Sequence, residues 1–197
     1  MKDIHTGRPL ARPMPRQRGV TLTETLLVLG VAALLAAVAY RAFGTARADA
    51  RLQDLSSGTI ALVNKVSLVF GGSADYSALT PENLVKAGAL PSQFRAEGSG
   101  PSTGLRDLFG NPFVVNGAQG SWSFHFTNLT REACSTLAPQ LAAVAYAIRA
   151  GTEAAAANGV VGTTGVEVKA AGGTVNTANL LTGCSQSNPR LAVEIRS

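Results

Sequence analysis

The chain has 197 residues and a formal net charge of +5. Its first 19 residues hold five basic side chains and one acidic one, which leaves twelve basic and eleven acidic side chains in the remainder. A nearly neutral remainder does not favour a nucleic-acid-binding module, which needs a basic patch on the folded domain, and we predict no specific nucleic-acid partner.

Residues 1–19 form a basic, proline-rich leader, and prolines at positions 9, 13 and 15 disfavour helix there. The positive charge predicts that the leader stays in the cytoplasm while the rest of the chain is exported. From Val20 to Tyr40 the chain is apolar, and Glu24 is its only charged residue. As a helix this stretch is about 31 Å long, close to the roughly 30 Å hydrocarbon thickness of a bilayer. We therefore predict an apolar transmembrane or filament-core helix over residues 20–40.

The order of leader and apolar core is unusual for an export signal. An ordinary secretory signal is cleaved after its apolar core, for example after Ala36 or Ala37 in this chain, so that the core is discarded. Gly19 instead precedes the core, and cleavage between Gly19 and Val20 would leave the apolar helix on the mature chain. The segments that resemble the type IV prepilin signature are Arg18–Glu24 and the apolar run Leu26–Gly30.

This resemblance covers about the first fifth of the chain and is fairly specific, because it combines a basic leader, a glycine, a glutamate and an apolar helix in one order. The 19-residue leader and the first mature residue, Val20, are more similar to type IVb than to type IVa pilins. The resemblance implies cleavage by a prepilin peptidase after Gly19 and N-methylation of Val20. It also implies that Glu24 pairs with the terminal amine of an adjacent subunit during assembly.

Glu24 also stands out on physical grounds. A carboxylate within a membrane helix costs roughly 2.5–3.5 kcal/mol and usually has a partner. The amine that cleavage creates on Val20 is a suitable partner, and a carboxylate also complements a helix N-terminus. The alternative is that Glu24 lies near the helix end and reaches lipid headgroups or water.

The helix is predicted to continue to about Phe70, because no proline interrupts it and residues 41–70 are amphipathic. We interpret this second half as the part of a spine helix that packs on a head domain, residues 71–197. A plain membrane anchor with a stalk would show the same pattern. A Gly-Gly-Ser sequence at 71–73 ends the helix.

Three further features are expected before residue 130. A short helix begins after Thr80, which is a good N-cap and precedes Pro81. Ser92–Asn111 is rich in Gly, Ser and Pro and is predicted to be an exposed loop, either a subunit contact or a passive connector. Two strands, Phe113–Val115 and Trp122–Thr127, follow with a turn between them, and the alternation in the second predicts a half-buried strand with His125 on its polar face.

A second helix is predicted from Thr130, its N-cap, to about Arg149, kinked or divided by Pro139 and ended by Gly151. Small residues dominate the next segment, whose glycines lack the Gly-Lys-Ser/Thr of a phosphate loop. The last three elements expected are a short strand at Val166–Val168, a helical turn at Thr177–Leu181 and a closing strand at Leu191–Ile195.

Cys134 and Cys184 are the only cysteines, and both lie in the exported part of the chain. An exported compartment permits a disulfide, and two cysteines allow one intramolecular pairing. Closing a loop of about 50 residues would contribute roughly 4 kcal/mol. Two buried free thiols are the alternative. No C-x-x-C redox motif is present, and His5 and His125 lack the spacing of metal ligands, so no cofactor or metal is expected.

The predicted fold class is α+β: a long N-terminal helix packed on a small antiparallel sheet, with a second helix and a C-terminal disulfide loop. The order is similar to type IVb pilin heads, in which a cysteine also lies early in the second helix. We expect a structural subunit of the thin-pilus type, for attachment or conjugation, that moves from the inner membrane to an extracellular homo-oligomeric filament through pilus assembly machinery.

Other functions share parts of this sequence pattern. A minor pilin or a type II secretion pseudopilin shares the leader motif, although the head length and the cysteine pair disfavour a major pseudopilin. A membrane-anchored periplasmic enzyme is a distant alternative. Ser121, Ser123 and His125 are neighbours, but neither an orienting acid nor a nucleophile turn accompanies them, and enzymatic activity is not expected.

Overall fold

The structure is a computed structural model that describes residues 21–196. The chain divides into two compact units, with the boundary after Thr45. The second unit, from Ala46 onward, contains the sheet and most of the buried core. The expected leader, residues 1–19, lies outside the described residues, as does Val20.

The predicted long helix is confirmed as α1, Leu22–Phe70. In its second half, buried side chains recur three and four residues apart and form the face that packs on the head: Leu52, Leu55, Leu62, Val63 and Val66. A 3-10 turn at Gly71–Ser73 follows, and Ala74 then adopts a left-handed conformation with φ 52°. The helix therefore ends at the predicted Gly-Gly-Ser.

The predicted short helix is also confirmed, as α2, Pro81–Lys86. Its N-cap is Thr80, whose Oγ1 accepts a hydrogen bond from the Asn83 amide at 3.2 Å. The cap satisfies one of the free N–H groups in the first turn, which is why this local signal could be found in the sequence.

The prediction of an exposed loop over Ser92–Asn111 is wrong in part. The segment contains β1 (Arg95–Glu97), a 3-10 turn (Gly100–Ser102) and β2 (Gly104–Arg106). Each strand has three residues, and Leu105 is the only buried side chain in either. Their extended conformation depends on antiparallel pairing, β1 with β2 and β2 with β3, rather than on an apolar pattern of their own.

The predicted pair of strands is confirmed: β3 spans Pro112–Ala118 and is longer than predicted, while β4 spans Ser121–Phe126 and begins one residue earlier than predicted. The expected half-burial of the second strand is wrong, because all six residues of β4 are buried. Trp122, Phe124 and Phe126 face the apolar core, while the opposite face of the strand is covered by residues 152–165.

The predicted helix from Thr130 to Arg149 is correct only in its first half. α3 spans Arg131–Leu141, with Pro139 near its end, and Ala147–Gly151 form a strand, β5. β5 pairs with β9 and β8, so Gly151 ends a strand rather than a helix. The apolar run across positions 141–148 suited either a helix or a strand, and the sheet partners decided between them.

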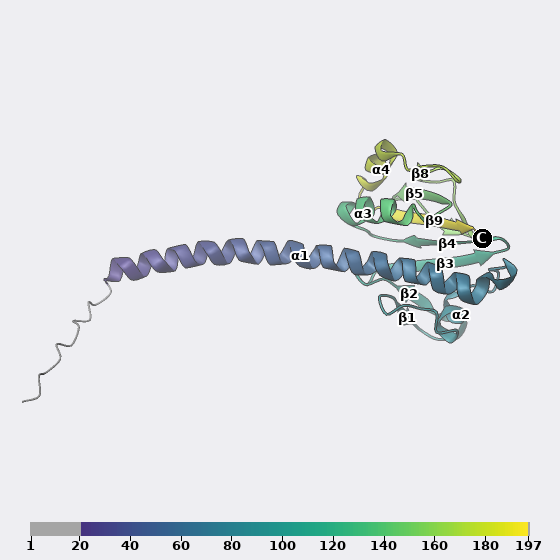
Figure 1. Ribbon diagram of the computed structural model, residues 1–197, viewed down its shortest axis with the longest axis horizontal. Helices are drawn as coiled ribbons and strands as arrows, with labels where there is room; N and C mark the ends of the chain where they lie inside the picture. Colours follow the sequence, from purple (N-terminus) through teal and green to yellow (C-terminus); the bar gives the residue numbers. More distant parts are fainter. Residues whose placement is uncertain (1–20, 197) are drawn as a thin grey trace, which may run out of the picture. The chain divides into compact units, whose positions relative to one another are not determined.

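The last three predicted elements occur in the predicted order, each longer than predicted, and they follow a two-stranded ribbon that was not predicted. A two-stranded ribbon, β6 (Ala156–Ala157) and β7 (Val160–Val161), precedes β8 (Val166–Lys169), α4 (Thr177–Cys184) and β9 (Arg190–Arg196). The main sheet is antiparallel, with the order β1-β2-β3-β4-β9-β5-β8 (Figure 1). The C-terminal strand β9 thus lies between β4 and β5, in the interior of the sheet.

One continuous apolar core joins the helices to one face of the sheet. Strand register places alternate residues of β3, β4 and β9 on this face, where they meet buried side chains of α1 and α3. The largest fully buried side chains there are aromatic: Phe113, Trp122, Phe124 and Phe126. This packing confirms the α+β class, with a larger sheet than predicted.

Candidate assembly site

The first turn of α1 carries the predicted assembly residue, Glu24. The Glu24 amide donates to the Thr21 carbonyl oxygen at 3.0 Å, and the Thr25 hydroxyl donates to the Leu22 carbonyl oxygen at 2.8 Å. The Glu24 side chain is exposed and lies in the first turn, where its negative charge interacts favourably with the positive end of the helix dipole. Gly19 and Val20, the predicted cleavage and methylation positions, precede the described residues.

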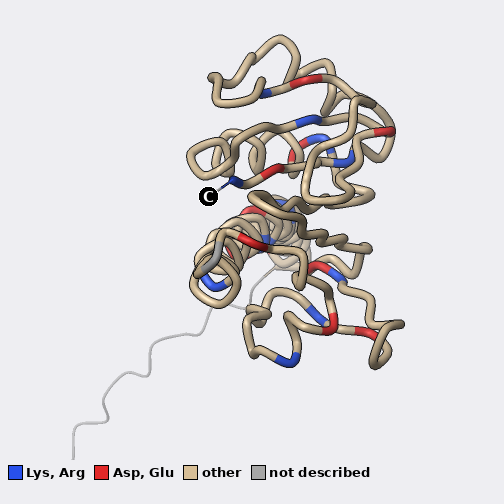
Figure 2. The backbone as a smooth tube through the Cα atoms, turned by 90° about the vertical axis from the view of Figure 1, so that its right-hand side faces the viewer, with Lys and Arg blue, Asp and Glu red and all other residues tan. Residues whose placement is uncertain are grey.

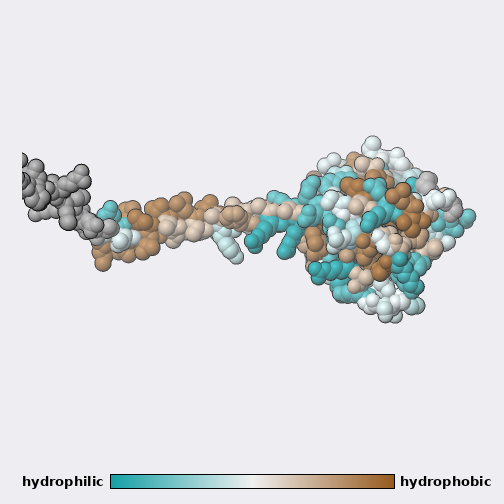
Figure 3. Space-filling view, turned by 60° about the horizontal axis from the view of Figure 1, so that its bottom comes forward, coloured by the Kyte–Doolittle hydropathy of each residue, from teal (hydrophilic) through white to brown (hydrophobic). Residues whose placement is uncertain are grey.

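The N-terminal half of α1 exposes large apolar side chains, and Figure 3 shows the hydrophobic surface on the side of the helix in view. Its large exposed side chains are Leu22, Leu26, Leu27, Val28, Leu29, Val31, Leu34, Leu35, Val38, Tyr40 and Phe43. An 18-residue window of this helix has a mean hydropathy of 2.2 and no buried residues, and the helix is long and apolar enough to cross a membrane by length and composition. A helix that is apolar all round requires a lipid or protein environment.

A disulfide joins Cys134 to Cys184, as predicted, with a Cα–Cα distance of 5.5 Å. Both cysteines are buried, and the bond ties α3 to α4 across 50 positions of sequence. A nearby contact supports the same junction, because the Arg131 guanidinium donates to the Ser185 carbonyl oxygen at 3.3 Å. The disulfide thus fixes α4 to α3 within the head.

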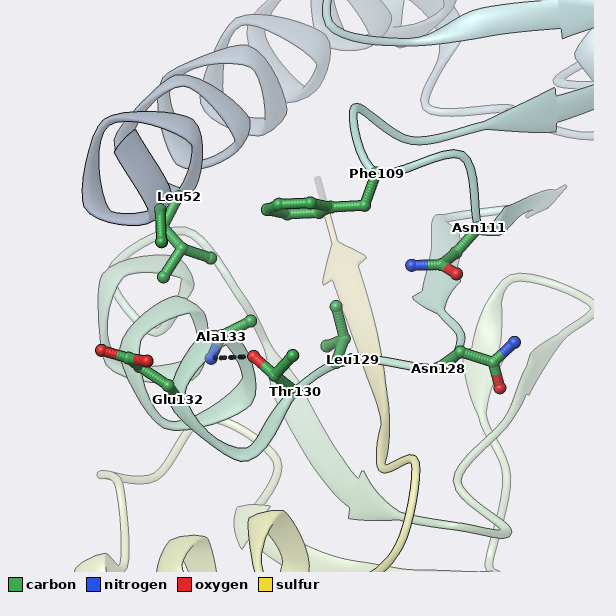
Figure 4. A pocket seen from close by; sticks show the side chains of 9 residues that line it. Leu52, Phe109, Asn111, Asn128, Leu129, Thr130, Glu132 and Ala133 are labelled. Carbon is green, nitrogen blue, oxygen red and sulfur yellow. Dashed lines mark hydrogen bonds between the residues drawn. The ribbon is translucent and has the colours of Figure 1, made fainter. Parts of the chain in front are cut away.

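A pocket of about 240 Å³ opens at the base of α3 (Figure 4). It is lined by Ala48, Leu52, Phe109, Asn111, Asn128, Leu129, Thr130, Glu132 and Ala133. Figure 4 shows the Phe109 ring extending across the pocket between Leu52 and Leu129. Thr130 caps α3 as predicted, because its Oγ1 accepts from the Ala133 amide at 3.1 Å. The pocket combines apolar walls with a polar rim and contains no paired acid and base.

The serines and histidine of β4 do not form a catalytic arrangement. Ser121, Ser123 and His125 alternate along one strand face, and the His125 Nδ1 accepts a hydrogen bond from the Ala156 backbone amide at 3.2 Å. Burial and the nearby Arg190 charge hold the pKa of His125 below its ordinary value. Within residues 21–196, no three His, Cys, Asp or Glu side chains are grouped as metal ligands.

Charged residues of both signs are interspersed along the described chain rather than gathered by sign (Figure 2). Ion pairs join neighbouring strands, such as Arg106 with Glu97 at 2.6 Å and Arg149 with Glu167 at 3.1 Å. This arrangement agrees with the near-neutral composition of the chain after the leader.

Sequence reasoning missed the role of the small-residue segment after β5. Polar side chains from several strands bind its backbone, which no local motif signalled. The one available signal was the placement of His125 and Glu194 at alternate positions of strands, where a polar face needs either water or a covering segment.

Two family models match segments of this chain. A family model described as "PilS N terminal" matches residues 52–186, and one described as "Prokaryotic N-terminal methylation motif" matches residues 14–40. No curated protein matches the chain.

Solved pilin structures are among those that match the chain. The type IV pilin TcpA from Vibrio cholerae El Tor biotype has 12% sequence identity and a TM-score of 0.51, over 73% of this chain and 98% of that one. A type IVb pilin from Salmonella typhi has 14% identity and a TM-score of 0.49, over 76% and 99%. The PilS model covers more than half of the sequence, from the second half of α1 to the disulfide-bonded α4, and the chain therefore belongs to the type IVb pilins.

Proposed function

We propose that this pilin is the building subunit of a thin type IV pilus used for adhesion or conjugation. The observation that carries the proposal is the exposed apolar surface of α1 from Leu22 to Phe43. Such a surface is satisfied by lipid before assembly and by the same helix of neighbouring subunits afterwards. Pilins are structural proteins, so the chain is not an enzyme.

The proposed processing follows from the position of the methylation motif. Residues 1–19 are the leader, which a prepilin peptidase removes by cleavage after Gly19, and Val20 is then N-methylated. The new amine would be on the residue four positions before Glu24 in the sequence. Pairing of Glu24 with the amine of an adjacent copy would bring together two charges that the apolar surroundings disfavour separately.

The proposed parts of the mature chain are the membrane or filament-core helix 20–40, the amphipathic helix 41–70 and the head 71–197. Before assembly the head lies in the periplasm and the helix in the inner membrane. Pilus assembly machinery then extracts the subunit into an extracellular homo-oligomeric filament. Head residues exposed on the filament would make the contacts with a surface or a recipient cell.

Mass spectrometry of the protein from its native host, without reductant, tests the processing. We expect the mass of Val20–Ser197, about 14 Da heavier for one methyl group and about 2 Da lighter for the disulfide. N-terminal sequencing should begin at Val20. An uncut chain, or one cut after Ala36 or Ala37, would overturn the proposal, because neither leaves a processed apolar helix.

A further inference from the structure

Residues 152–165, here called the flap, cover the sheet face opposite the helices. The flap contains the β6–β7 ribbon, and its charged side chain is Glu153, which is exposed. The ribbon contacts β3, β4 and β9. Register places Asn116, His125 and Glu194 on this face, from three neighbouring strands.

Polar side chains of the sheet bind the flap backbone. The Ala156 amide donates to His125 Nδ1 at 3.2 Å, and the Ala156 carbonyl oxygen accepts from Asn116 Nδ2 at 3.1 Å. The Val161 amide donates to Glu194 Oε2 at 3.1 Å. Arg149 on β5 donates to the carbonyl oxygens of residues 163 and 165, at 2.8 and 3.1 Å. Four adjacent strands thus each supply one side chain.

Apolar packing beneath the flap is slight. The separate buried cluster there consists of Ala154, Ala156 and Ala192, with Val161 packed against it. An alanine side chain contributes a single methyl group, and burial stabilises by only about 0.8 kcal/mol per carbon. The Ser123 hydroxyl is also buried there without a partner among residues 21–196, which costs free energy. The polar contacts therefore decide whether the flap stays docked.

The hydrogen bond from the Ala156 amide to His125 requires an imidazole whose Nδ1 carries no proton. An imidazole nitrogen accepts a hydrogen bond only when it carries no proton, and both nitrogens are donors in the cation. Protonation at Nδ1 would therefore set two N–H groups against each other at Ala156. His125 is 8% exposed, so the added charge would also be poorly solvated.

The charged groups facing His125 either repel a positive charge or are already engaged by other groups. From β9, Arg190 opposes a positive charge, while the Glu194 carboxylate is engaged by the Val161 amide and by Arg196 at 2.8 Å. From β5, Arg149 is engaged by Glu167 and the flap. β3 and the β6–β7 ribbon contribute no ionisable side chain, and Glu153 of the flap is exposed. A cation at position 125 thus gains no unengaged anion from the strands around it.

We propose that the flap is a pH-sensitive element, docked on the sheet at neutral pH and released when His125 gains a proton in mildly acidic solution. Release exposes the face that carries Ser123, His125 and Glu194. The pilin would then present a different surface in acid, while the disulfide-bonded side of the head stays folded. This inference does not depend on how the pilin is processed or assembled.

The direction of the pH effect follows from proton binding. Docking lowers the pKa of His125 relative to the open head because the flap buries the ring, whereas the Arg190 charge on β9 lowers the pKa of His125 in both states. The docked flap therefore binds fewer protons than the open one. Docking is at full strength above the pKa of His125 in the open head, weakens as the pH falls, and levels off below the docked pKa. Each pKa unit of depression gives up to a tenfold larger opening constant.

Hydrogen exchange with mass spectrometry on the full mature chain in detergent tests the proposal. Exchange at pH 7.5 and pH 5.0 is compared after scaling the times for intrinsic exchange rates. Peptides that cover residues 152–165 should lose protection at pH 5.0, while peptides from α3 should not. Unchanged flap protection, or an equal loss in every peptide of the head, would overturn the proposal.

His125→Asn is the matched variant, because the Asn Oδ1 can accept from the Ala156 amide at the position of Nδ1 and does not titrate. The flap of this variant should stay protected at both pH values. A pH response as large as that of the unchanged protein would assign the effect to another group and contradict the proposal.

The variant Arg190→Gln tests the electrostatic effect on His125 without changing His125 itself. Removing the neighbouring positive charge should raise the pKa of His125 in both the docked and the open state, so the loss of protection should begin at a higher pH. A loss that begins at the same or a lower pH would contradict the electrostatic part of the argument, even if the first variant fails to fold.

Discussion

Two single residues, Glu24 and Gly117, have specific roles, Glu24 in the proposed assembly and Gly117 in packing. Glu24 is an exposed acidic side chain in the first turn of α1, and it is the one charged residue between Leu22 and Tyr40. In an apolar environment an isolated carboxylate is costly, so a positive partner from another copy has a large effect on assembly.

Glu24→Ala should leave cleavage and methylation unchanged and reduce the number of filaments. A loss of 1.4 kcal/mol at one contact already lowers an association constant about tenfold, so we expect pilus yield to fall by about that factor or more in electron micrographs of cells. Thr23→Ala, in the same turn but without a charge, is the control. Normal filaments from the Glu24 variant would contradict the proposed pairing.

Gly117 in β3 permits a close approach of the chain that follows α1. A Cβ atom built at this position would overlap the Tyr76 carbonyl oxygen and lie 2.7 Å from the Leu79 Cβ. The Tyr76 amide donates to the Ala118 carbonyl oxygen at 3.0 Å, which holds the two segments together. The strand alternation in the sequence did not reveal this crossing.

Gly117→Ala should therefore destabilise the head by about 1–3 kcal/mol, as expected for an overfilled packed site. Thermal unfolding followed by circular dichroism measures the effect. Gly72→Ala is the control, since no atom lies within 4 Å of a Cβ there. Equal melting temperatures for the two variants would mean that the segment near Tyr76 moves aside at little cost.

At the scale of elements, the end of α3 shows how a distant residue can decide a boundary. After Leu141 the chain leaves the helix, and the Lys169 ammonium of β8 donates to the carbonyl oxygens of Ala142 and Ala145, at 2.7 Å and 2.5 Å. These carbonyls belong to the turn between α3 and β5. A cation at a helix C-terminus both satisfies free carbonyls and complements the helix dipole.

Replacing Lys169 by methionine keeps the chain length but leaves the two carbonyl oxygens without their donor. The expected loss is about 1–3 kcal/mol, the cost of unsatisfied buried polar groups, measured by denaturant unfolding. Lys86→Met is the comparison, because Lys86 forms an exposed ion pair with Glu82 on α2 and such pairs contribute about 0–1 kcal/mol. A Lys169 effect no larger than the Lys86 effect would contradict this role.

At the scale of the whole molecule, the head depends on links between distant parts of the chain. The disulfide connects α3 with α4, while β9 inserts between β4 and β5. The last strand must therefore find its place between partners made earlier in the chain, and the disulfide restricts the conformations available to the unfolded segment between the cysteines.

Reduction of the disulfide should lower stability by about 4 kcal/mol in the chain-entropy description. Cys134→Ser, Cys184→Ser and the double variant should unfold at similar denaturant concentrations, below that of the oxidised protein. If reduced and oxidised proteins unfold together, the bond contributes no net stability to the head.

The sequence by itself determined the features that depend on neighbouring residues. The long helix, the caps at Thr80 and Thr130 and the order of leader and apolar core all arise from periodicity or from contacts a few residues apart. The pairing of Cys134 with Cys184 followed because the exported chain holds two cysteines, and the resemblance at its N-terminus led to the pilin family.

Tertiary structure alone decided the features whose partners are far away in sequence. β1 and β2 are strands because an edge of the sheet accepts them, and residues 147–151 are a strand because β9 and β8 lie beside them. The polar face of β4 is buried because the flap returns to cover it. Backbone hydrogen bonds between strands and the covering of a polar face depend on distant segments, so local patterns do not encode them.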